Sequence, residues 1–393
     1  SQGVQSGVSI SFGDARYSEE SGEAFRNLLT SAETGWIITD GGAVLKVLPR
    51  FISTWDTRKT DYYSASTTKI KIPLSRSGLY DFEVNWGDGL VNHVTNASSG
   101  GREHTYSSPG VYTISITGTL SGWQGYGAEG FAAGTSSDMV KLTSIHQWDA
   151  LQFLNPDQSF VSDLAPNQYR MSDLNFYKAA NLTGLPLDAP QTDASGYMKG
   201  LFYDADGITG AVSSITGWDT SSFKDISSFF FMVDDFDADL SYWDVSNVTN
   251  MQSLFYYTSF NNNGSPHISG WDVSNVTNML GMFSASLFDQ DIGAWDVGNV
   301  TDMKQMFRPQ AHDVNVSSHF NNGGSSSISG WDTSSVTNMY GLFEVNRRFN
   351  QPIGSWDVSN VTSMYQMFRN SAFNQPIGDW DTSSLTNMEQ MFY

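Results

Sequence analysis

A tryptophan–aspartate pair recurs seven times in the second half of the chain and constrains the fold more than any other sequence feature. The tryptophans stand 24 to 36 residues apart, at Trp218, Trp243, Trp271, Trp295, Trp331, Trp356 and Trp380. A phenylalanine follows each of them by twelve positions, at Phe230, Phe255, Phe283, Phe307, Phe343, Phe368 and Phe392. An aliphatic residue precedes each tryptophan by three positions, and apolar residues follow it by five and eight. A repeat of this period is typical of proteins whose units stack on one another.

The spacing inside one unit predicts its local structure. Apolar residues eight, eleven and twelve positions after the tryptophan would lie on one face of a single helical turn. The Val-Thr-Asn stretch suits a short strand, and aspartate followed by serine favours a tight turn. We therefore expect a mixed β and α/β fold class. In it, the repeats form a leucine-rich-like solenoid with short strands and single helical turns, and stacking buries the tryptophans and phenylalanines.

Less regular copies of the unit precede the regular ones. We expect degenerate repeats from residue 141 to about 210 and regular repeats over 211–393. One degenerate copy matches at Ile145, Trp148, Phe153 and Phe160, and another, centred on Pro190, matches at Leu187, Met198, Leu201 and Phe202. A further copy, whose frame the sequence does not fix, is expected between Leu164 and Leu182. The last repeat ends without a polar capping unit, which predicts that the array is incomplete at the C-terminus.

The regular unit carries a family resemblance. The segment from Phe349 to Phe368 resembles the repeat of BspA-like bacterial surface proteins, which is shared with mycoplasma-type surface lipoproteins and grouped with leucine-rich repeats. The resemblance implies adhesion and display at a surface.

A different pattern occupies residues 51–121. Apolar and polar residues alternate over 80–86 and 112–117, and turn residues separate these segments, which predicts a small β-sandwich. The segments Trp86-Gly-Asp-Gly89 and His104–Thr113 resemble polycystic-kidney-disease-type (PKD) domains. That resemblance implies a spacer or recognition module on an extracellular protein. Residues 1–50 are expected to form an N-terminal arm or anchor, and the Gly/Ser-rich residues 122–140 a connection.

The composition excludes several classes of protein. The 20 Lys and Arg against 41 Asp and Glu give a net charge of −21, which argues against nucleic acid as a partner. No apolar run reaches the roughly 18 residues of a membrane span. Cysteine is absent, which excludes disulfides and thiolate metal sites. The start at Ser1 fits either a removed signal peptide or simple loss of the initiator methionine.

Catalytic and metal-binding patterns are weak. The six histidines show no metal-ligand spacing, and no nucleophile or nucleotide motif occurs, so we expect no enzyme and no cofactor. Two acidic clusters are calcium candidates, although solvated loops are the favoured interpretation: Asp204 and Asp206, and Asp234, Asp235, Asp237 and Asp239. The aspartate after each tryptophan is expected to close a turn rather than to bind a ligand. The Asn-Val-Thr triplets at Asn247, Asn275, Asn299 and Asn360 are interpreted as part of the repeat rather than as glycan acceptors.

These features together predict a non-enzymatic structural or adhesion protein displayed at a surface. Its repeats would present an extended binding face to a protein or glycan partner on a cell or particle. One alternative is a phage virion protein, a tail fibre or decoration protein, anchored by its N-terminal segment. A second alternative is the accessory region of a larger carbohydrate-active protein. The expected location is extracellular, on a cell surface or a virion surface, and the N-terminal arm would allow self-assembly by strand addition.

Overall fold

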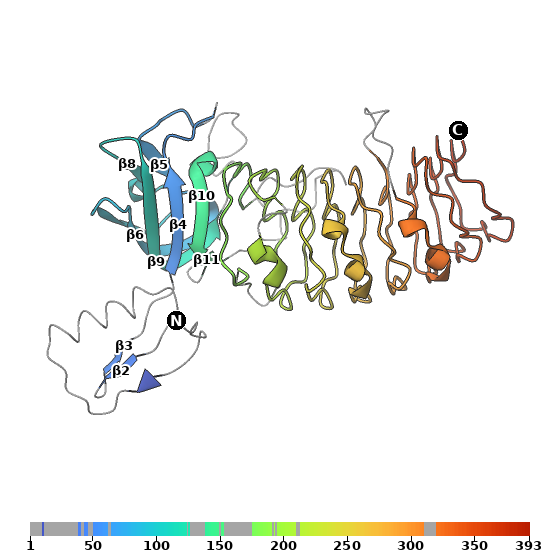
Figure 1. The fold of residues 1–393 in the computed structure, drawn as a ribbon, viewed down its shortest axis with the longest axis horizontal. Coiled ribbons are helices and arrows are strands. Elements are labelled where there is room, and N and C mark those ends of the chain that lie inside the picture. Colours follow the sequence, from blue (N-terminus) through green and yellow to red (C-terminus); the bar gives the residue numbers. More distant parts are fainter. Residues whose placement is uncertain are drawn as a thin grey trace.

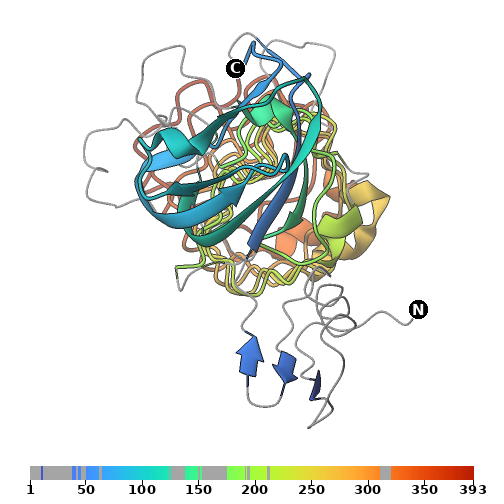
Figure 2. The same ribbon diagram turned by 90° about the vertical axis from the view of Figure 1, so that its left-hand side faces the viewer.

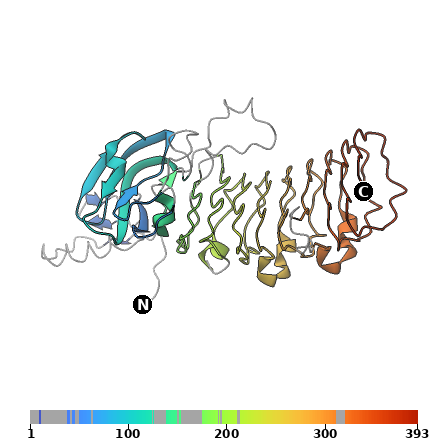
Figure 3. The ribbon, with the colours of Figure 1, turned by 90° about the horizontal axis from the view of Figure 1, so that it is seen from above.

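The computed structural model describes the chain in segments. These are residues 10–11, 38–40, 43–45, 50–61, 64–123, 125, 138–148, 151–152, 175–190, 192, 195–209, 213–309 and 320–393. β-Sheets lie at the N-terminal end, and a long row of stacked repeats extends from them to the C-terminus (Figure 1). The same order is visible from above (Figure 3). Each repeat is called a coil below.

The strands form three sheets. A three-stranded sheet has the order β1-β2-β3, with β1 at Ile10–Ser11, β2 at Ile38–Asp40 and β3 at Ala43–Leu45. The main sheet has the order β10-β4-β9-β6-β7, and β11 pairs with β9: β4 Arg50–Asp56, β6 Leu74–Asn85, β7 Val91–Val94, β9 Val111–Trp123, β10 Leu142–Gln147 and β11 Leu151–Gln152. β5 (Lys69–Lys71) and β8 (Glu103–Thr105) form a two-stranded sheet. Most of the predicted N-terminal arm lies outside the described residues.

The main sheet forms where the sequence alternates. Along β4 and β9 every second side chain is buried over several residues, and the two strands pair antiparallel from Arg50–Thr117 to Asp56–Val111. The turn after β6 requires glycine at Gly87, where φ is +82° and an added Cβ would lie 2.5 Å from the Thr113 carbonyl oxygen. Figure 2 shows these sheets in front of the stacked coils. The segment boundaries at residues 50, 121 and 140 stay predictions.

The row of coils begins on the edge of the main sheet. Ser144 in β10 forms a parallel bridge with Gly184, and the Ile145 amide donates to the Gly184 carbonyl at 2.8 Å. Further isolated parallel bridges link each coil to the next, at Tyr197–Asp225, Asp225–Asn250, Asn250–Asn278, Asn278–Asp302, Asp302–Asn338, Asn338–Ser363 and Ser363–Asn387. All of these residues stand seven positions after the tryptophan of their coil, and for Tyr197 the tryptophan position is filled by Pro190. The first coil therefore covers the β10 edge of the sheet.

The predicted fold class, mixed β and α/β with a leucine-rich-like solenoid of short strands and single helical turns, is wrong. The described residues contain no α-helix. The coils pair through isolated bridges in place of strands, so the observed molecule is β-rich. Within the coils, the described helices are short 3-10 segments: η5 Ser213–Gly217, η6 Asn262–Gly264, η7 Pro266–Gly270, η8 Asn322–Gly324 and η9 Ser326–Gly330. Two more, η1 (Gly100–Arg102) and η2 (Asp138–Lys141), accompany the sheets.

Backbone conformation explains why the helical turn does not form. Ser253 and Tyr257, ten and fourteen positions after Trp243, have φ of 53° and 56°, which lie in the left-handed region. The Ser253 and Phe255 amides donate to carbonyls of the next coil, those of Leu280 and Met282, at 2.8 and 2.9 Å. In an α-helix these amides would donate to carbonyls four residues earlier. The helix-like spacing of apolar residues therefore arises from consecutive tight turns.

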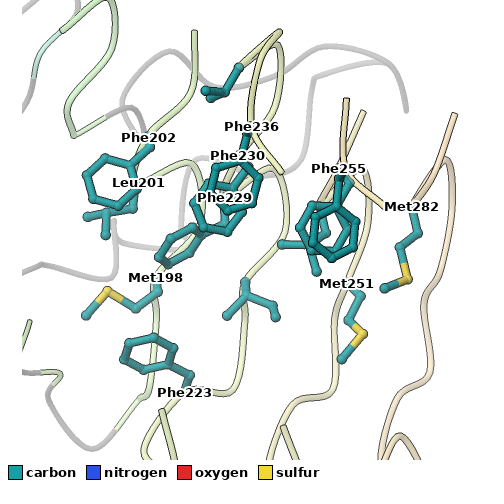
Figure 4. Close-up of a cluster of buried hydrophobic side chains, with 14 of the residues drawn as sticks. Met198, Leu201, Phe202, Phe223, Phe229, Phe230, Phe236, Met251, Phe255 and Met282 are labelled. Carbon is teal, nitrogen blue, oxygen red and sulfur yellow. The ribbon is translucent and has the colours of Figure 1, made fainter. Parts of the chain in front are cut away.

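One continuous aromatic core runs through the sheet and the coils. Phe51 contacts Trp123 with ring centroids 4.9 Å apart, and Trp123 contacts Phe176 at 5.9 Å. The phenylalanines twelve positions after each tryptophan then continue the core from Phe176, with centroids 5.6 to 6.1 Å apart: Phe202, Phe230, Phe255, Phe283, Phe307, Phe343, Phe368 and Phe392. Figure 4 shows the early part of this row with its methionines. Each buried large side chain contributes roughly 1.5–3 kcal/mol to stability.

The structure clarifies the degenerate copies. The Phe176 amide donates to the Leu201 carbonyl at 2.9 Å, as the equivalent phenylalanines do in later coils, so Phe176 belongs to the copy expected between Leu164 and Leu182. The predicted match at Leu187 is wrong, because this side chain is 82% exposed. Ile145 and Trp148 are buried as expected. Phe153 and Phe160 lie outside the described residues.

Candidate binding surface

The tryptophans link neighbouring coils from inside the core. From Trp243 onward, each indole Nε1 donates to the carbonyl of the aliphatic residue that stands three positions before the tryptophan of the preceding coil. The pairs are Trp243–Ile215, Trp271–Leu240, Trp295–Ile268, Trp331–Ile292, Trp356–Ile328 and Trp380–Ile353, at 2.8 to 3.2 Å. The donating tryptophans are buried up to Trp356, and Trp380 is half-buried. These residues hold the coils in register and are not available to a ligand.

The aspartate after each tryptophan is exposed and closes a turn. Asp272 Oδ1 accepts hydrogen bonds from the Ser274 amide at 3.1 Å and from its hydroxyl at 2.6 Å. The bonds from Ser274 hold the pKa of Asp272 below its usual range, so the group stays charged at neutral pH. The equivalent aspartates accept from the amide two residues later in the same way: Asp219, Asp244, Asp296, Asp332, Asp357 and Asp381.

Asparagine and threonine side chains next to the aspartates connect one coil to the previous one. Asn275 Nδ2 donates to the Ser246 carbonyl at 2.7 Å, and Thr277 Oγ1 donates to the Thr249 carbonyl at 3.2 Å. The same asparagine bond is made by Asn247, Asn299 and Asn360, and the same threonine bond by Thr301, Thr337, Thr362 and Thr386. The side-chain amide nitrogens of the asparagines in the Asn-Val-Thr triplets thus hydrogen-bond each coil to the previous one.

The aspartate, asparagine and threonine that stand one, four and six positions after the tryptophan line up from coil to coil and define a polar face. Its complete sets are Asp244, Asn247 and Thr249; Asp272, Asn275 and Thr277; Asp296, Asn299 and Thr301; and Asp357, Asn360 and Thr362, all exposed. Parallel pairing sets neighbouring coils about 4.8 Å apart, so like groups recur at that interval. Because internal bonds already fix these side chains, an extended polar partner would find hydroxyl and carboxylate acceptors at a small cost in side-chain entropy.

The calcium candidates divide into two groups. Asp237 Oδ1 accepts from the amides of Asn261 and Asn263 at 2.8 and 2.7 Å. Asp239 Oδ1 accepts from the Ser241 amide at 3.0 Å. Both carboxylates therefore accept from backbone amides, Asp237 from the next coil and Asp239 from its own turn, which the acidic run in the sequence did not reveal.

The remaining calcium candidates lie near one another. Burial raises the pKa of Asp204 to about 6, and the carboxylates of Asp206 and Asp234 add to the rise. Lys178 Nζ lies 4.0 Å from Asp204. Asp235 is exposed next to Asp234. In the part of the chain that the structure describes, no three His, Asp or Glu side chains are placed to hold a metal ion.

His104 is packed within the sheet domain, the part of the chain that holds strands β4 to β11. Its Nε2 lies 2.7 Å from Asp88 Oδ2, its ring stacks on Trp86 with centroids 5.1 Å apart, and it meets the edge of Tyr106 at 4.5 Å. The Tyr106 hydroxyl donates to the Trp86 carbonyl at 2.9 Å. These contacts fix the Trp86-Gly-Asp-Gly89 turn against β8 and the residue that follows it.

One buried charge cluster was not foreseen from the sequence. Glu344 is 1% exposed and lies between Arg308, at 2.7 Å, and Arg369, at 3.2 Å. All three stand thirteen positions after their tryptophans, where Phe231 and Tyr256 stand in earlier coils. The alternation Arg-Glu-Arg at one repeat position was the signal available in the sequence.

The sheet domain, the coils and the polar face together define the class of this protein. It is a repeat protein whose stack starts on a β-sheet domain and displays a regular polar surface. Residues 169–266, 196–321 and 314–393 match the family described as Mycoplasma protein of unknown function, DUF285. Together the matches span more than half of the 393 residues, so the chain belongs to this family, which is part of the BspA-like and mycoplasma surface protein group. No curated protein and no solved structure matches the chain. Among the described residues, no helix is long and apolar enough to cross a membrane.

Proposed function

We propose that this chain is a non-enzymatic, surface-displayed adhesion protein that binds its partner through the polar face. The observation that carries the proposal is the repetition of exposed, internally bonded Asp, Asn and Thr side chains from coil to coil, as at Asp272, Asn275 and Thr277. Membership of a group of surface proteins supports it.

The chemistry of the face suits binding rather than catalysis. Catalysis needs a few unlike groups brought together in one pocket, whereas this face repeats the same three groups along the stack. Weak hydrogen bonds at many equivalent sites favour an extended, polar partner such as a glycan chain or a protein segment. The enclosed tryptophans and phenylalanines stabilise the stack that presents these groups.

The sheet domain is proposed to be a PKD-like spacer. The support is the Trp86-Gly-Asp-Gly89 turn with its His104 and Tyr106 contacts, together with the pairing of β10 to the first coil. A spacer joined in this way would hold the polar face at a fixed orientation to whatever precedes it. The virion and carbohydrate-active alternatives stay predictions of the sequence.

The test is a binding assay of the full chain against an immobilised panel of glycans and extracellular-matrix proteins. The face variant is Thr277→Val, Thr301→Val and Thr362→Val, which keeps side-chain shape and removes three exposed hydroxyls. The matched control is Thr95→Val, Thr105→Val and Thr119→Val, at exposed positions of the sheet domain.

We expect at least one panel member to bind, the face variant to lose about tenfold in affinity, equivalent to ~1.4 kcal/mol, and the control to bind as the parent does. If no panel member binds, or if the face variant binds like the parent, the proposal is wrong.

A further inference from the structure

The stack has a second ordered feature, on the edge that follows the core phenylalanines. This charged edge comprises the described residues 13 to 17 positions after each tryptophan position, which in the coil of Trp295 are Arg308 and Pro309 alone. In the two coils centred on Pro190 and Trp218 it carries Asp204, Asp206, Asp234 and Asp235. In the coils of Trp295, Trp331 and Trp356 it carries Arg308, Arg347, Arg348 and Arg369. The edge is therefore acidic near the sheet domain and basic near the C-terminus.

The counts at the two ends balance among the described residues. Four carboxylates and the neighbouring Lys178 give the acidic end a net charge of −3. Four guanidinium groups and the buried Glu344 give the basic end a net charge of +3. Arg348 also lies 3.6 Å from Asp289, with 52% of its side chain exposed. This distribution stands out in a chain of net charge −21.

Contacts between coils show that both ends share one edge. The rings of Tyr203 and Phe231 stack with centroids 4.4 Å apart, and those of Phe231 and Tyr256 at 4.5 Å. The backbone continues the line, because the amides of Tyr257 and Ala285 donate to the carbonyls of Ser284 and Arg308 at 2.9 and 2.7 Å. Arg308, Glu344 and Arg369 complete it.

The middle of the charged edge is uncharged and partly apolar. The coils of Trp243 and Trp271 place Tyr-Tyr-Thr-Ser-Phe and Ser-Ala-Ser-Leu-Phe at these five positions. Leu287 is 40% exposed there, and Tyr256 and Tyr257 are half-buried. An apolar centre with charged flanks is the usual composition of a protein–protein interface.

Six of the charges are placed symmetrically about the coil of Trp271, whereas Arg308, one coil after it, has no charged counterpart in the coil of Trp243. Asp234 and Asp235 lie two coils before it, and Arg347 and Arg348 lie two coils after it, at the same repeat positions. Asp204 lies three coils before, and Arg369 three coils after. A two-fold axis through the central coil would bring each acidic pair of one copy against the basic pair of another.

We propose that the charged edge is the interface of an antiparallel, two-fold symmetric dimer of this chain. Such an interface is self-complementary, since the same patch is used by both copies. Arginine suits this role because its planar guanidinium forms paired hydrogen bonds with carboxylates. Leu287 of each copy lies near the axis, and the acidic end of one copy faces the basic end of the other.

Sedimentation and light scattering of the full chain test the dimer. We expect a dimer at low ionic strength whose dissociation constant rises at least tenfold in high salt, because salt screens exposed charges. Arg347→Asp with Arg348→Asp gives a monomer, and so does Asp234→Arg with Asp235→Arg. An equal mixture of these two variants forms a heterodimer, because each contact again joins opposite charges.

The control variant is Asp379→Arg with Glu389→Arg, which changes net charge as much as the Asp234 and Asp235 variant but lies off the charged edge. It is expected to remain dimeric. A parent chain that is monomeric at every salt and protein concentration overturns the proposal. So does a dimer that survives both edge variants, or a mixture of them that fails to pair.

The absence of cysteine offers an independent test of the axis. Leu287→Cys should cross-link to itself under mild oxidation, because a disulfide needs Cα atoms about 5.5 Å apart and only residues near the axis meet that condition. Tyr242→Cys, at a position 84% exposed elsewhere on the stack, should not cross-link. A dimer in which Leu287→Cys stays reduced would contradict the antiparallel arrangement.

Discussion

Two positions in each coil set the path of the backbone at the residue scale. Except at Pro309, the residues ten and fourteen positions after the tryptophan that the structure describes adopt φ between about +53° and +61°. The first of the two is glycine in some coils, such as Gly281, and glutamine in others, such as Gln305. A side chain other than glycine costs roughly 1 kcal/mol in this region. The repeats thus carry a small strain at positions that evolution has filled with ordinary residues.

Replacing Gln305 with glycine should relieve that strain. We expect Gln305→Gly to raise the free energy of unfolding by about 0.5–1 kcal/mol in urea titrations. Gln252→Gly is the matched control, because Gln252 is not among the positive-φ residues. Glycine there adds flexibility to the unfolded chain and removes the acceptor of the Asn278 Nδ2 hydrogen bond at 3.3 Å, so this variant should lose stability. A stability loss in both variants would show that the left-handed conformation is not strained.

The aspartate turns make stability depend on pH. Because the folded-state pKa of Asp272 lies below that of an unfolded aspartate, about 3.9, its stabilisation is present above pH 4 and is lost as pH falls through the folded value. Asp272→Ala should therefore lower the melting temperature by a few degrees at pH 7 and have almost no effect at pH 2. Asp272→Asn keeps an acceptor for the Ser274 amide and should lose less. If Asp272→Ala leaves the melting temperature unchanged at pH 7, Asp272 does not stabilise the turn.

At the element scale, the coil is defined by hydrogen bonds that no local pattern reveals. The sequence indicated which residues enter the core, because apolar residues recur at fixed positions around Trp243 and Trp271. It did not indicate that the amides of Ser253 and Phe255 donate to the next coil, since the same spacing fits a helical turn. What separates the observed turns from a helical turn is the left-handed backbone at residues such as Ser253, and a serine in the sequence does not indicate that conformation.

The indole bonds offer a test of the coil as a unit. Trp295→Phe keeps an aromatic ring beside Trp271 but leaves the Ile268 carbonyl without its donor at 3.0 Å. We expect a loss of about 1–3 kcal/mol in unfolding free energy, since a buried acceptor is left unsatisfied. Trp380→Phe, in a half-buried position, should lose less. Both variants remove an indole bond, so equal losses would mean that the cost does not depend on how deeply the tryptophan is buried.

At the scale of the whole molecule, the sheet domain and the coils share one core. The contact runs from Phe51 through Trp123 and Phe176 to Phe202. The sequence predicted a sandwich and a repeat array but not their junction, because Phe176 lies in a degenerate copy whose frame the pattern did not fix. In stacked repeats, stability spreads through contacts between neighbours.

Phe176→Ala should break this coupling. We expect the parent chain to unfold in one calorimetric transition and the variant in two, with the coils nearest the sheet losing about 3–5 kcal/mol. Phe368→Ala removes an equivalent ring far from the junction and should keep a single, lower transition. Two transitions in the parent chain would indicate that the sheet domain and the coils are already independent.

The polar face is the proposed site of partner binding, and hydrogen exchange of the full chain with and without its tightest-binding panel member tests this proposal most directly. Exchange reports protection of individual backbone segments. We predict slower exchange in the segments 244–249, 272–277, 296–301 and 357–362, and unchanged exchange in β4 and β9. Protection confined to the sheet domain, or to the charged edge at 231–235 and 344–348, would contradict the account.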